Sequence, residues 1–497
     1  MPLTTRCTSR LVLLALVSLG LVWGGATVAA AKTASPTLEG PVTGGRGAPF
    51  LATTAFDLTE VGYSQAEYFI SGTATAYTNG GDLASDGRWK VIPGATAAYR
   101  TRVLVYRPSN PKNFKGTVVV EWLNVSGGLD AAADWLGAHA ELIRKGFAWM
   151  GVSAQAVGVE GGTAIVPGIP PLPLKTTDPV RYGSLMHPGD SFSYDIFSQA
   201  GQAIRHPAGM SPLGELKVKK IIADGESQSA YRLVTYINGV HPLARVYDGF
   251  LVHSRGASAA PLSEAPQPRI PAPIHALIRT DLRVPVLVFE TETDLGFLGY
   301  FSDRQPDGKR FRLWEVAGTA HVDAYTLIVG PVDSGDSPAA AELTVTSSPV
   351  PGLIRCGAPI NSGPQHFVLN AAVEALDRWA RHGKPPPRAP RLEVAPAPPV
   401  TIVRDAHANA LGGIRTPQVD VPIATLSGQG QTGSIFCILF GTTTPFDAAT
   451  LASLYPSHDA YVSAFDEATK RARRAGFIVK PDAELMEHVA ASSAIGK

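Results

Sequence analysis

Residues 218–237, VKKIIADGESQSAYRLVTYI, contain the turn on which the organisation of the whole chain depends. The β-branched run at 218–223 predicts a buried parallel strand, and the apolar spacing after the turn predicts a helix. Ser227 stands between them, with Gly225 before it and the small Ser229 after it. This spacing is typical of the strained strand-to-helix turn that presents a nucleophilic serine, because larger side chains would collide there. The alternative interpretation is an ordinary helix N-cap.

The composition is that of a large globular protein with many loops. The 497 residues are 45% hydrophobic and 17% charged, and they include 50 glycines and 41 prolines. The formal net charge is +1, from 43 Lys and Arg residues and 42 Asp and Glu residues. Such a balance provides no overall field to attract a nucleic acid or an anionic membrane. We therefore expect no nucleic-acid partner.

Residues 1–31 are predicted to be a signal peptide. Arg6 and Arg10 precede the apolar run LVLLALVSLGLVWGG, and the AAA sequence at 29–31 supplies small residues for cleavage. An uncleaved membrane anchor is the alternative, although the apolar run is short for a membrane span. We expect a secreted or periplasmic protein that begins near Lys32, with no stable membrane insertion after cleavage.

Cleavage of that segment would leave Cys356 and Cys437 as the only cysteines. In an oxidising compartment such a pair predicts one disulfide bond, and two free buried thiols are the alternative. A bond between these two residues would staple the C-terminal part of the chain to the rest of the protein.

Predicted strands alternate with predicted helices through the central part of the chain. Strands are predicted at residues 61–77, 99–106, 116–123, 147–154, 245–252, 285–289 and 311–316, and helices around 135–143, at 192–204 and at 365–382. This alternation predicts an α/β fold with a mostly parallel central sheet and helices on both faces. We expect residues 32–497 to form a single domain.

Three segments do not follow this alternation. The segments 157–188 and 255–273 are rich in proline with glycine or alanine, and they are predicted to be cap-like insertions near the substrate. The segment 390–497 is predicted to be a C-terminal extension, with strands and loops at 391–440 and helix at 447–477. We expect this extension to pack on the main sheet.

Candidate partners for the serine follow two later strands. Asp294 comes after the strand PVLVF, and His321 comes after the strand FRLWEV in the small-residue loop AGTAH. A serine nucleophile needs a base and a third group that holds this base, and carboxyl ends of parallel strands meet at one edge of a sheet. The order Ser227, Asp294, His321 therefore predicts a catalytic triad. Glu290 and Glu292 compete with Asp294 for the acid role.

A triad also needs N–H donors that stabilise the oxyanion formed on the substrate. The backbone N–H of Gln228, directly after the serine, is predicted to be one donor. The second donor is expected in the loop that follows the strand at 116–123, from Asn124 or Val125.

No metal or cofactor is predicted. Asp130 and Asp134 share a predicted helix face, and Asp405 and His407 are close in sequence, but neither pair has further ligands at a familiar spacing. The glycine-rich segments lack the preceding strand and following helix of a nucleotide-binding fingerprint.

Several distinctive segments occur together in the chain: EWLNVSGGLD, DGESQSA, ETETDL, AGTAH, NSGPQHFVLNAAVEALDRW and GGIRTPQVDVPIATLSG. Over nearly the whole mature length, this combination resembles a bacterial family of secreted or periplasmic α/β-hydrolase domain proteins. The resemblance implies the α/β-hydrolase fold and gives Ser227, Asp294 and His321 the triad roles. The apolar and proline-rich insertions predict a small-molecule ester substrate of some hydrophobic character.

The sequence therefore predicts a serine hydrolase of carboxylic esters. An acyltransferase or a peptidase that uses the same three residues is one alternative, and a catalytically inactive binding protein with a hydrolase fold is another. Neither composition nor motifs separate hydrolysis from acyl transfer, because that choice depends on the access of water to the acyl-enzyme.

Overall fold

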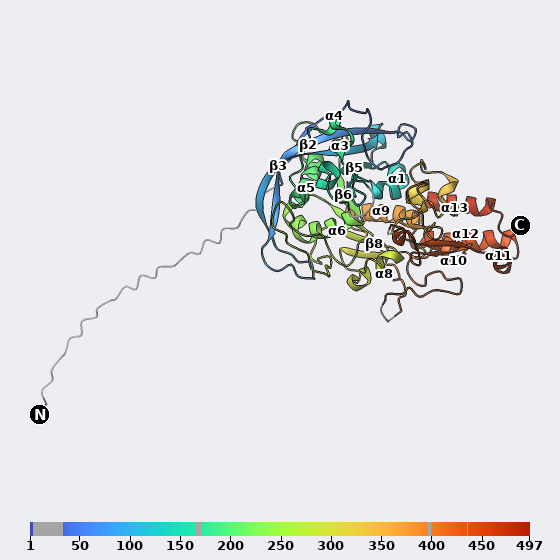
Figure 1. Ribbon diagram of the computed structural model, residues 1–497. Coiled ribbons are helices and arrows are strands. Elements are labelled where there is room, and N and C mark those ends of the chain that lie inside the picture. The colour runs from blue at the N-terminus through green and yellow to red at the C-terminus, as the bar shows by residue number, and fades with distance from the viewer. Residues whose placement is uncertain (3–32, 165–169, 396–398, 435) are drawn as a thin grey trace. The chain divides into compact units, whose positions relative to one another are not determined.

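Figure 1 shows the computed structural model of the chain, which describes residues 1–2, 33–164, 170–395, 399–434 and 436–497. The predicted signal peptide lies outside the described residues apart from its first two positions. Residues Thr33–Lys497 form one compact unit. None of the helices in the described ranges combines the length and the hydrophobicity that crossing a bilayer requires.

A nine-stranded sheet with the order β1-β2-β3-β5-β4-β6-β7-β8-β9 forms the centre of the protein (Figure 1). The strands from β5 across to β9 pair in parallel, whereas β1, β2 and β3 form an antiparallel part that joins β5. The strands are β1 Thr37–Glu39, β2 Tyr63–Asn79, β3 Val91–Pro108, β4 Thr117–Trp122, β5 Ala148–Val152, β6 Lys220–Glu226, β7 Gly249–His253, β8 Val286–Glu290 and β9 Phe311–Glu315. The predicted α/β class with a mostly parallel sheet is confirmed.

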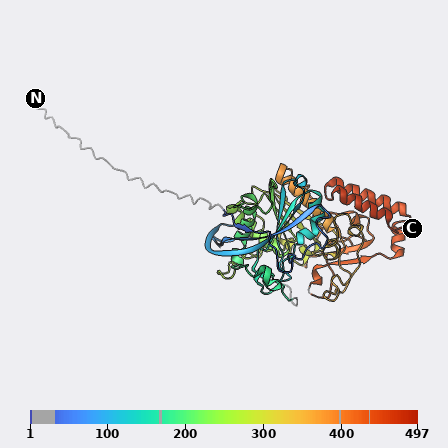
Figure 2. The same cartoon turned by 90° about the horizontal axis from the view of Figure 1, so that it is seen from above.

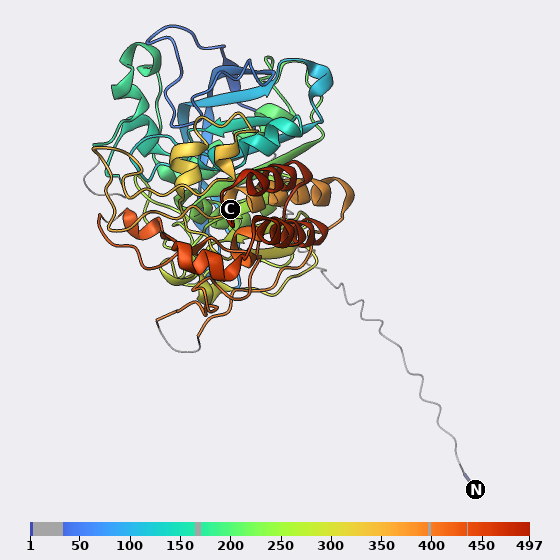
Figure 3. The ribbon, with the colours of Figure 1, turned by 90° about the vertical axis from the view of Figure 1, so that its right-hand side faces the viewer.

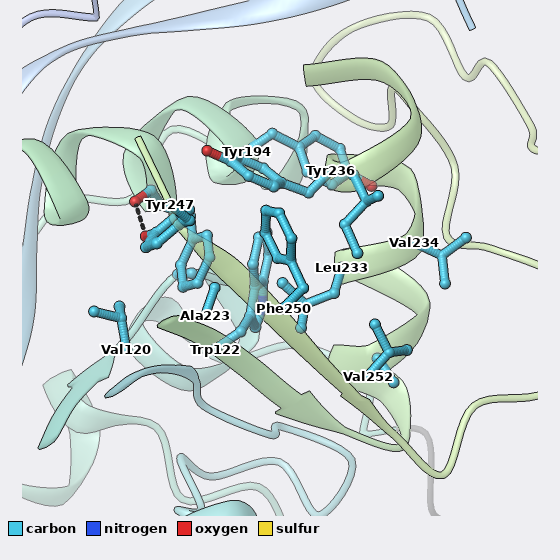
Figure 4. Close-up of a cluster of buried hydrophobic side chains, with 14 of the residues drawn as sticks. Val120, Trp122, Tyr194, Ala223, Leu233, Val234, Tyr236, Tyr247, Phe250 and Val252 are labelled. Atoms are coloured by element: carbon cyan, nitrogen blue, oxygen red, sulfur yellow. Dashed lines mark hydrogen bonds between the residues drawn. The ribbon is translucent and has the colours of Figure 1, made fainter. Parts of the chain in front are cut away.

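Helices cover both faces of the parallel strands, which explains why β4, β5, β7, β8 and β9 are buried along their whole length. On one face, α1 (Ala133–Arg144) and α9 (Gln365–His382) share a hydrophobic core with the strands. On the other face, α5 (Ser193–Arg205) and α6 (Gln228–Thr235) do the same. Figure 4 shows this second core, in which Trp122 of β4 and Phe250 of β7 lie below Tyr194 of α5.

The boundaries of two strands differ from the prediction. β3 begins at Val91 rather than at residue 99, because its first part pairs with β2 in a ribbon that contains Pro93 and is mostly exposed, which hides the strand pattern. β7 begins at Gly249 rather than at residue 245, since Arg245 adopts a left-handed conformation with φ of 52° that ends the preceding α7 (His241–Ala244).

The described residues of the segment 157–188 lie beside the antiparallel part of the sheet. The segment contains part of α2 (Ala156–Glu160) and all of α3 (Leu174–Thr177) and α4 (Pro179–Tyr182). Leu174 and Tyr182 pack on Phe69 of β2, and the Arg181 guanidinium forms a buried ion pair with Glu67 at 2.6 Å. The segment 255–273 has no helix or strand longer than the single bridge between Ser263 and Ile270. A substrate-facing role for either segment stays a prediction.

The C-terminal extension packs on the core. It contains the small sheet of β10 (Ala424–Ser427) and β11 (Thr442–Pro445) and the helices α10 (Pro417–Asp420), α11 (Ala448–Leu454), α12 (His458–Ala475) and α13 (Lys480–Ser492). Figures 2 and 3 show α12 and α13 side by side, and a hydrophobic cluster joins them to Phe367 of α9. The prediction missed α13, because its buried face is formed mainly by small residues such as Ala483 and Ala490, which produce a weak hydrophobic period.

The two cysteines of the described chain form the predicted disulfide. Cys356 lies in the loop before α9, and Cys437 lies in the turn before β11. Their Cα atoms are 5.5 Å apart, and 81 positions separate them in the sequence. The bond ties the C-terminal extension to the segment that leads into α9.

Candidate active site

Ser227 occupies a strained position between β6 and α6. Its φ of 56° and ψ of −119° are values that side-chain-bearing residues rarely adopt. Its backbone N–H donates to the His253 carbonyl at 2.9 Å, which anchors the turn to the next strand. A Cβ atom on Gly225 would lie 3.0 Å from the Cβ atom of Ser229, so the turn requires small residues at both positions. The Ser227 hydroxyl caps no backbone N–H of α6, which contradicts the N-cap interpretation.

His321 lies in the loop that follows β9, and its ring joins the serine to a carboxylate. Nε2 is 2.8 Å from the Ser227 Oγ, and Nδ1 is 2.6 Å from the Asp294 Oδ1. An ionised carboxylate only accepts hydrogen bonds, so Nδ1 carries the proton and Nε2 accepts from the serine hydroxyl. Burial lowers the pKa of His321, but the charges of Asp294 and Glu226 raise it more, and the net shift is upward.

Asp294 is held in the first turn of α8 (Glu292–Gly296) by a capping box. Its Oδ2 accepts from both the backbone N–H and the hydroxyl of Thr291, each at 2.7 Å, which leaves Oδ1 for the imidazole. Burial raises the pKa of Asp294, but His321 and the Thr291 hydrogen bonds outweigh this effect and lower the pKa below its ordinary value. The carboxylate is therefore ionised in the resting site.

The two competing carboxylates do not contact His321. Glu292 accepts from the backbone N–H groups of Gly318 at 2.7 Å and Gly428 at 3.1 Å, and it pairs with Arg404 at 2.8 Å. The oxygens of Glu290 have no hydrogen-bond partner among the described residues. Burial, with the nearby charge of Asp294, raises the pKa of Glu290 well above its usual range. The structure thus brings together the serine, the histidine and Asp294.

The two predictions for the second oxyanion donor have different outcomes. The backbone N–H of Asn124 donates to the Ala131 carbonyl at 2.9 Å, so the prediction that it serves the oxyanion is wrong. This bond closes a short hairpin, because the Ala131 N–H donates back to the Asn124 carbonyl at 2.8 Å. The backbone N–H groups of Val125 and Gln228 have no acceptor within the described part of the chain. Their role as oxyanion donors stays a prediction.

Glu226, the last residue of β6, is a site residue that was not predicted from the sequence. Its Oε1 lies 3.2 Å from the His321 Nε2, and its Oε2 accepts from the side-chain amide of Asn124 at 3.1 Å. Burial raises the pKa of Glu226 to about 7, although the imidazoles of His321 and His253 lower it. The sequence shows that Glu226 directly precedes the serine, but only the folded protein shows its contact with His321 and its register with His253 on the neighbouring strand.

A second histidine and carboxylate lie behind Glu226. The Nε2 of His253 is 3.0 Å from the side-chain nitrogen of Gln365 and accepts from it, so Nδ1 carries the proton that it shares with Asp134 at 2.8 Å. Burial lowers the pKa of His253, but the hydrogen bond and charge of Asp134 and the charge of Glu226 produce a net rise. Asp130 instead pairs with Arg102 at 2.5 Å, so the two aspartates that were compared as metal ligands belong to separate networks.

A small pocket adjoins these groups and is bordered by α1 and α9. It is lined by Ala133, Gly137, Glu226, His253, His321, Val322, Thr326, Gln365, His366 and Leu369. Both ring nitrogens of His366 are buried with no partner among the described residues, and the ring stacks on Tyr325 with the centroids 3.6 Å apart. No group of three His, Cys, Asp or Glu residues in the described ranges is arranged to hold a metal ion.

The fold and the strand-end arrangement of serine, carboxylate and histidine define the class of α/β-hydrolases. Residues 38–488 match the family described as alpha/beta hydrolase domain, and the chain belongs to this family. A comparison with curated proteins finds no match.

Solved structures that resemble the chain include three hydrolases. A serine hydrolase without a lid from Xanthomonas campestris has 12% identity and a TM-score of 0.27, over 49% of this chain and 83% of that one. A fungal esterase from Rhizomucor miehei has 10% identity and a TM-score of 0.26, over 54% and 78% of the two chains. A glucuronoyl esterase from Solibacter usitatus has 10% identity and a TM-score of 0.26, over 51% and 76%.

Proposed function

We propose that the protein is a serine hydrolase that cleaves carboxylic esters through an acyl-enzyme. The observation that carries this proposal is the continuous chain from the Ser227 Oγ to the His321 Nε2 at 2.8 Å and from the His321 Nδ1 to Asp294 at 2.6 Å. The strained backbone of Ser227 also supports the proposal, because such strain is concentrated at functional sites, where the surrounding structure maintains it. A protein that only binds its ligand would have no need of this arrangement.

In the proposed reaction, the Ser227 Oγ attacks the carbonyl carbon of the ester while the His321 Nε2 takes the hydroxyl proton. Asp294 holds the imidazole in the correct tautomer and stabilises the imidazolium. The tetrahedral oxyanion is placed near the N–H groups of Gln228 and Val125. The imidazolium then gives its proton to the departing alkoxide, and the same steps with water as the attacking group release the carboxylic acid.

We propose that the substrate is a small ester with some hydrophobic character, because the segments 157–188 and 255–273 are rich in apolar residues and proline. We also propose that residues 32–497 form a single α/β-hydrolase domain in which these segments act as caps. We place the protein in a secreted or periplasmic compartment, because the predicted signal peptide and the disulfide between Cys356 and Cys437 both suit an oxidising environment. No nucleic-acid partner forms part of the proposal.

Labelling with a fluorophosphonate probe tests the proposal directly. The wild-type protein is expected to be labelled and to cleave 4-nitrophenyl esters, and Ser227→Ala is expected to lose both activities while keeping its circular dichroism spectrum. The matched control is Ser229→Ala in the same turn, whose hydroxyl has no hydrogen-bond partner among the described residues. This control should keep labelling and turnover. Labelling of Ser227→Ala at the wild-type rate would refute the assignment of the nucleophile.

A panel of esters with increasing acyl length, assayed with and without an added alcohol, completes the test. Release of free acid as the main product supports hydrolysis, whereas transfer of the acyl group to the alcohol as the main product would favour the acyltransferase alternative.

A further inference from the structure

The Nε2 atom of His321 faces two oxygen atoms. One is the Ser227 Oγ at 2.8 Å, and the other is the Glu226 Oε1 at 3.2 Å. A ring nitrogen has a single lobe for hydrogen bonding, and in the resting site this lobe is directed at the serine. Accordingly, Oε1 is buried without a hydrogen bond of its own among the described residues. The carboxyl group of Glu226 therefore lies beside the His321 Nε2, the atom that gains a proton during the proposed reaction.

Two features of the fold hold Glu226 in this place. Glu226 is the last residue of β6 and is only 7% exposed. The Asn124 amide donates to both the Glu226 Oε2 and the Glu226 backbone carbonyl, each at 3.1 Å. The amide itself is oriented by the Ser126 N–H, which donates to the Asn124 Oδ1 at 2.8 Å. Because Oε2 is used in this way, Oε1 is the oxygen left for the histidine.

Charged and titratable groups surround Glu226 from several elements. They are His321 from the loop after β9, His253 from β7, Asp134 from α1 and Asp294 from α8. The helix α9 contributes Gln365 and His366 to the shared pocket, and burial lowers the pKa of His366 well below its usual value, so this ring is neutral. The two imidazoles favour the ionised form of Glu226, and the two aspartates oppose it.

We propose that Glu226 is a second carboxylate partner of His321, which acts on Nε2 while Asp294 acts on Nδ1. This inference rests on the proposed function. The imidazolium formed when the serine loses its proton lies between two carboxylates rather than beside one. Asn124 acts through Glu226 as a positioning residue, which differs from the oxyanion role that the sequence suggests for it.

The charge of Glu226 affects the dependence of the rate on pH. An ionised Glu226 favours the protonated form of His321 and raises the pKa of the imidazole. The neutral imidazole is the form that accepts the serine proton, so kcat/KM falls as the pH drops through this pKa. Removal of the Glu226 charge lowers the pKa of His321 and moves this acid limb to lower pH. The plateau of kcat falls at the same time, because the transition state loses one of two stabilising charges.

The test is Glu226→Gln, which preserves the size of the side chain and keeps an acceptor for Asn124. We expect the acid limb of kcat/KM to move down by about 1 to 3 units, as is usual when an opposite charge within hydrogen-bond range is lost. We also expect a loss in plateau kcat of roughly tenfold or more, because one charge-stabilising contact is removed from the transition state. The matched control is Glu290→Gln on β8, which replaces a buried carboxyl that does not contact His321. It should leave the acid limb in place.

Titration of the His321 ring by nitrogen-15 NMR separates this inference from the proposed function, since it requires neither substrate nor turnover. The pKa of His321 should be lower in Glu226→Gln than in the wild-type protein, even if the protein hydrolyses no ester in the panel. If Glu226→Gln does not fold, Glu226→Asp is measured instead, and its shorter side chain should produce a smaller downward shift. An unchanged His321 pKa together with an unchanged acid limb would overturn the inference.

Discussion

Replacement of Asp294 by asparagine is expected to reverse the tautomer of His321. The Asp294 Oδ2 accepts from the backbone N–H and the hydroxyl of Thr291, each at 2.7 Å. In Asp294→Asn these two donors keep the amide oxygen in the same place, so the amide nitrogen must face the His321 Nδ1. That nitrogen is a donor, and the imidazole therefore has to carry its proton on Nε2. The Ser227 hydroxyl then has no base.

The size of the effect follows from the same geometry. The carboxylate lies 2.6 Å from Nδ1, and at this distance the attraction to an imidazolium is about 6 kcal/mol at an effective dielectric constant of 20, before desolvation is subtracted. A rate loss of about 10⁴ corresponds to about 5 kcal/mol. We therefore expect Asp294→Asn to lower kcat by about three to four orders of magnitude, which agrees with the loss on removal of a triad acid in other serine enzymes.

The assay is the steady-state hydrolysis of a 4-nitrophenyl ester, with Glu292→Gln as the matched control from the same helix. Glu292 binds the Gly318 and Gly428 N–H groups and Arg404, so its replacement should change kcat by less than about tenfold. The same replacement should lower the free energy of unfolding by about 1 to 3 kcal/mol, because buried donors lose a charged acceptor. The reverse ranking of kcat in the two variants would refute the reasoning.

Three further predictions concern stability and the serine turn. Replacement of Cys356 and Cys437 by alanine should lower the free energy of unfolding by up to about 4.5 kcal/mol, because the disulfide closes a loop of 81 residues. Urea unfolding measures this loss. Two alkylatable thiols in the native wild-type protein would contradict the disulfide. Gly225→Val should abolish probe labelling and lower the free energy of unfolding by about 1 to 3 kcal/mol, because even the Cβ of the new valine would lie 3.0 Å from the Cβ of Ser229. Full labelling of this variant would show that the turn can relax. Burial raises the pKa of Glu141 from 4.5 to about 7, so between these values the folded state holds a proton that the unfolded state releases, and the contribution of Glu141 to stability falls as the pH rises. Urea unfolding at both ends of this window should show a weaker pH dependence for Glu141→Gln than for the wild-type protein, and equal slopes would argue against the raised pKa.

The sequence alone was sufficient for the α/β class and for the three residues that the site brings together. Apolar runs such as the one at 116–123 have a strand signal that does not depend on distant contacts, and β4 forms there. Parallel strands then place their carboxyl ends at one edge, so Ser227, Asp294 and His321 are neighbours wherever the chain obeys this topology. The place of each of these residues just after a strand can therefore be predicted from the nearby sequence alone.

The tertiary structure decided which side-chain and backbone groups are free to act. Glu292 is excluded from the acid role because Arg404 and Gly428, more than a hundred positions away, occupy its oxygens. The Asn124 N–H is excluded from the oxyanion role because it donates to the Ala131 carbonyl. The side-chain amide of Asn124 donates to Glu226 instead. Each polar group satisfies its hydrogen bonds with whichever donor or acceptor the fold brings within reach, and for buried groups these partners come from remote segments. Local sequence patterns contain no information about such partners, which is why Glu226 became visible only in the folded protein.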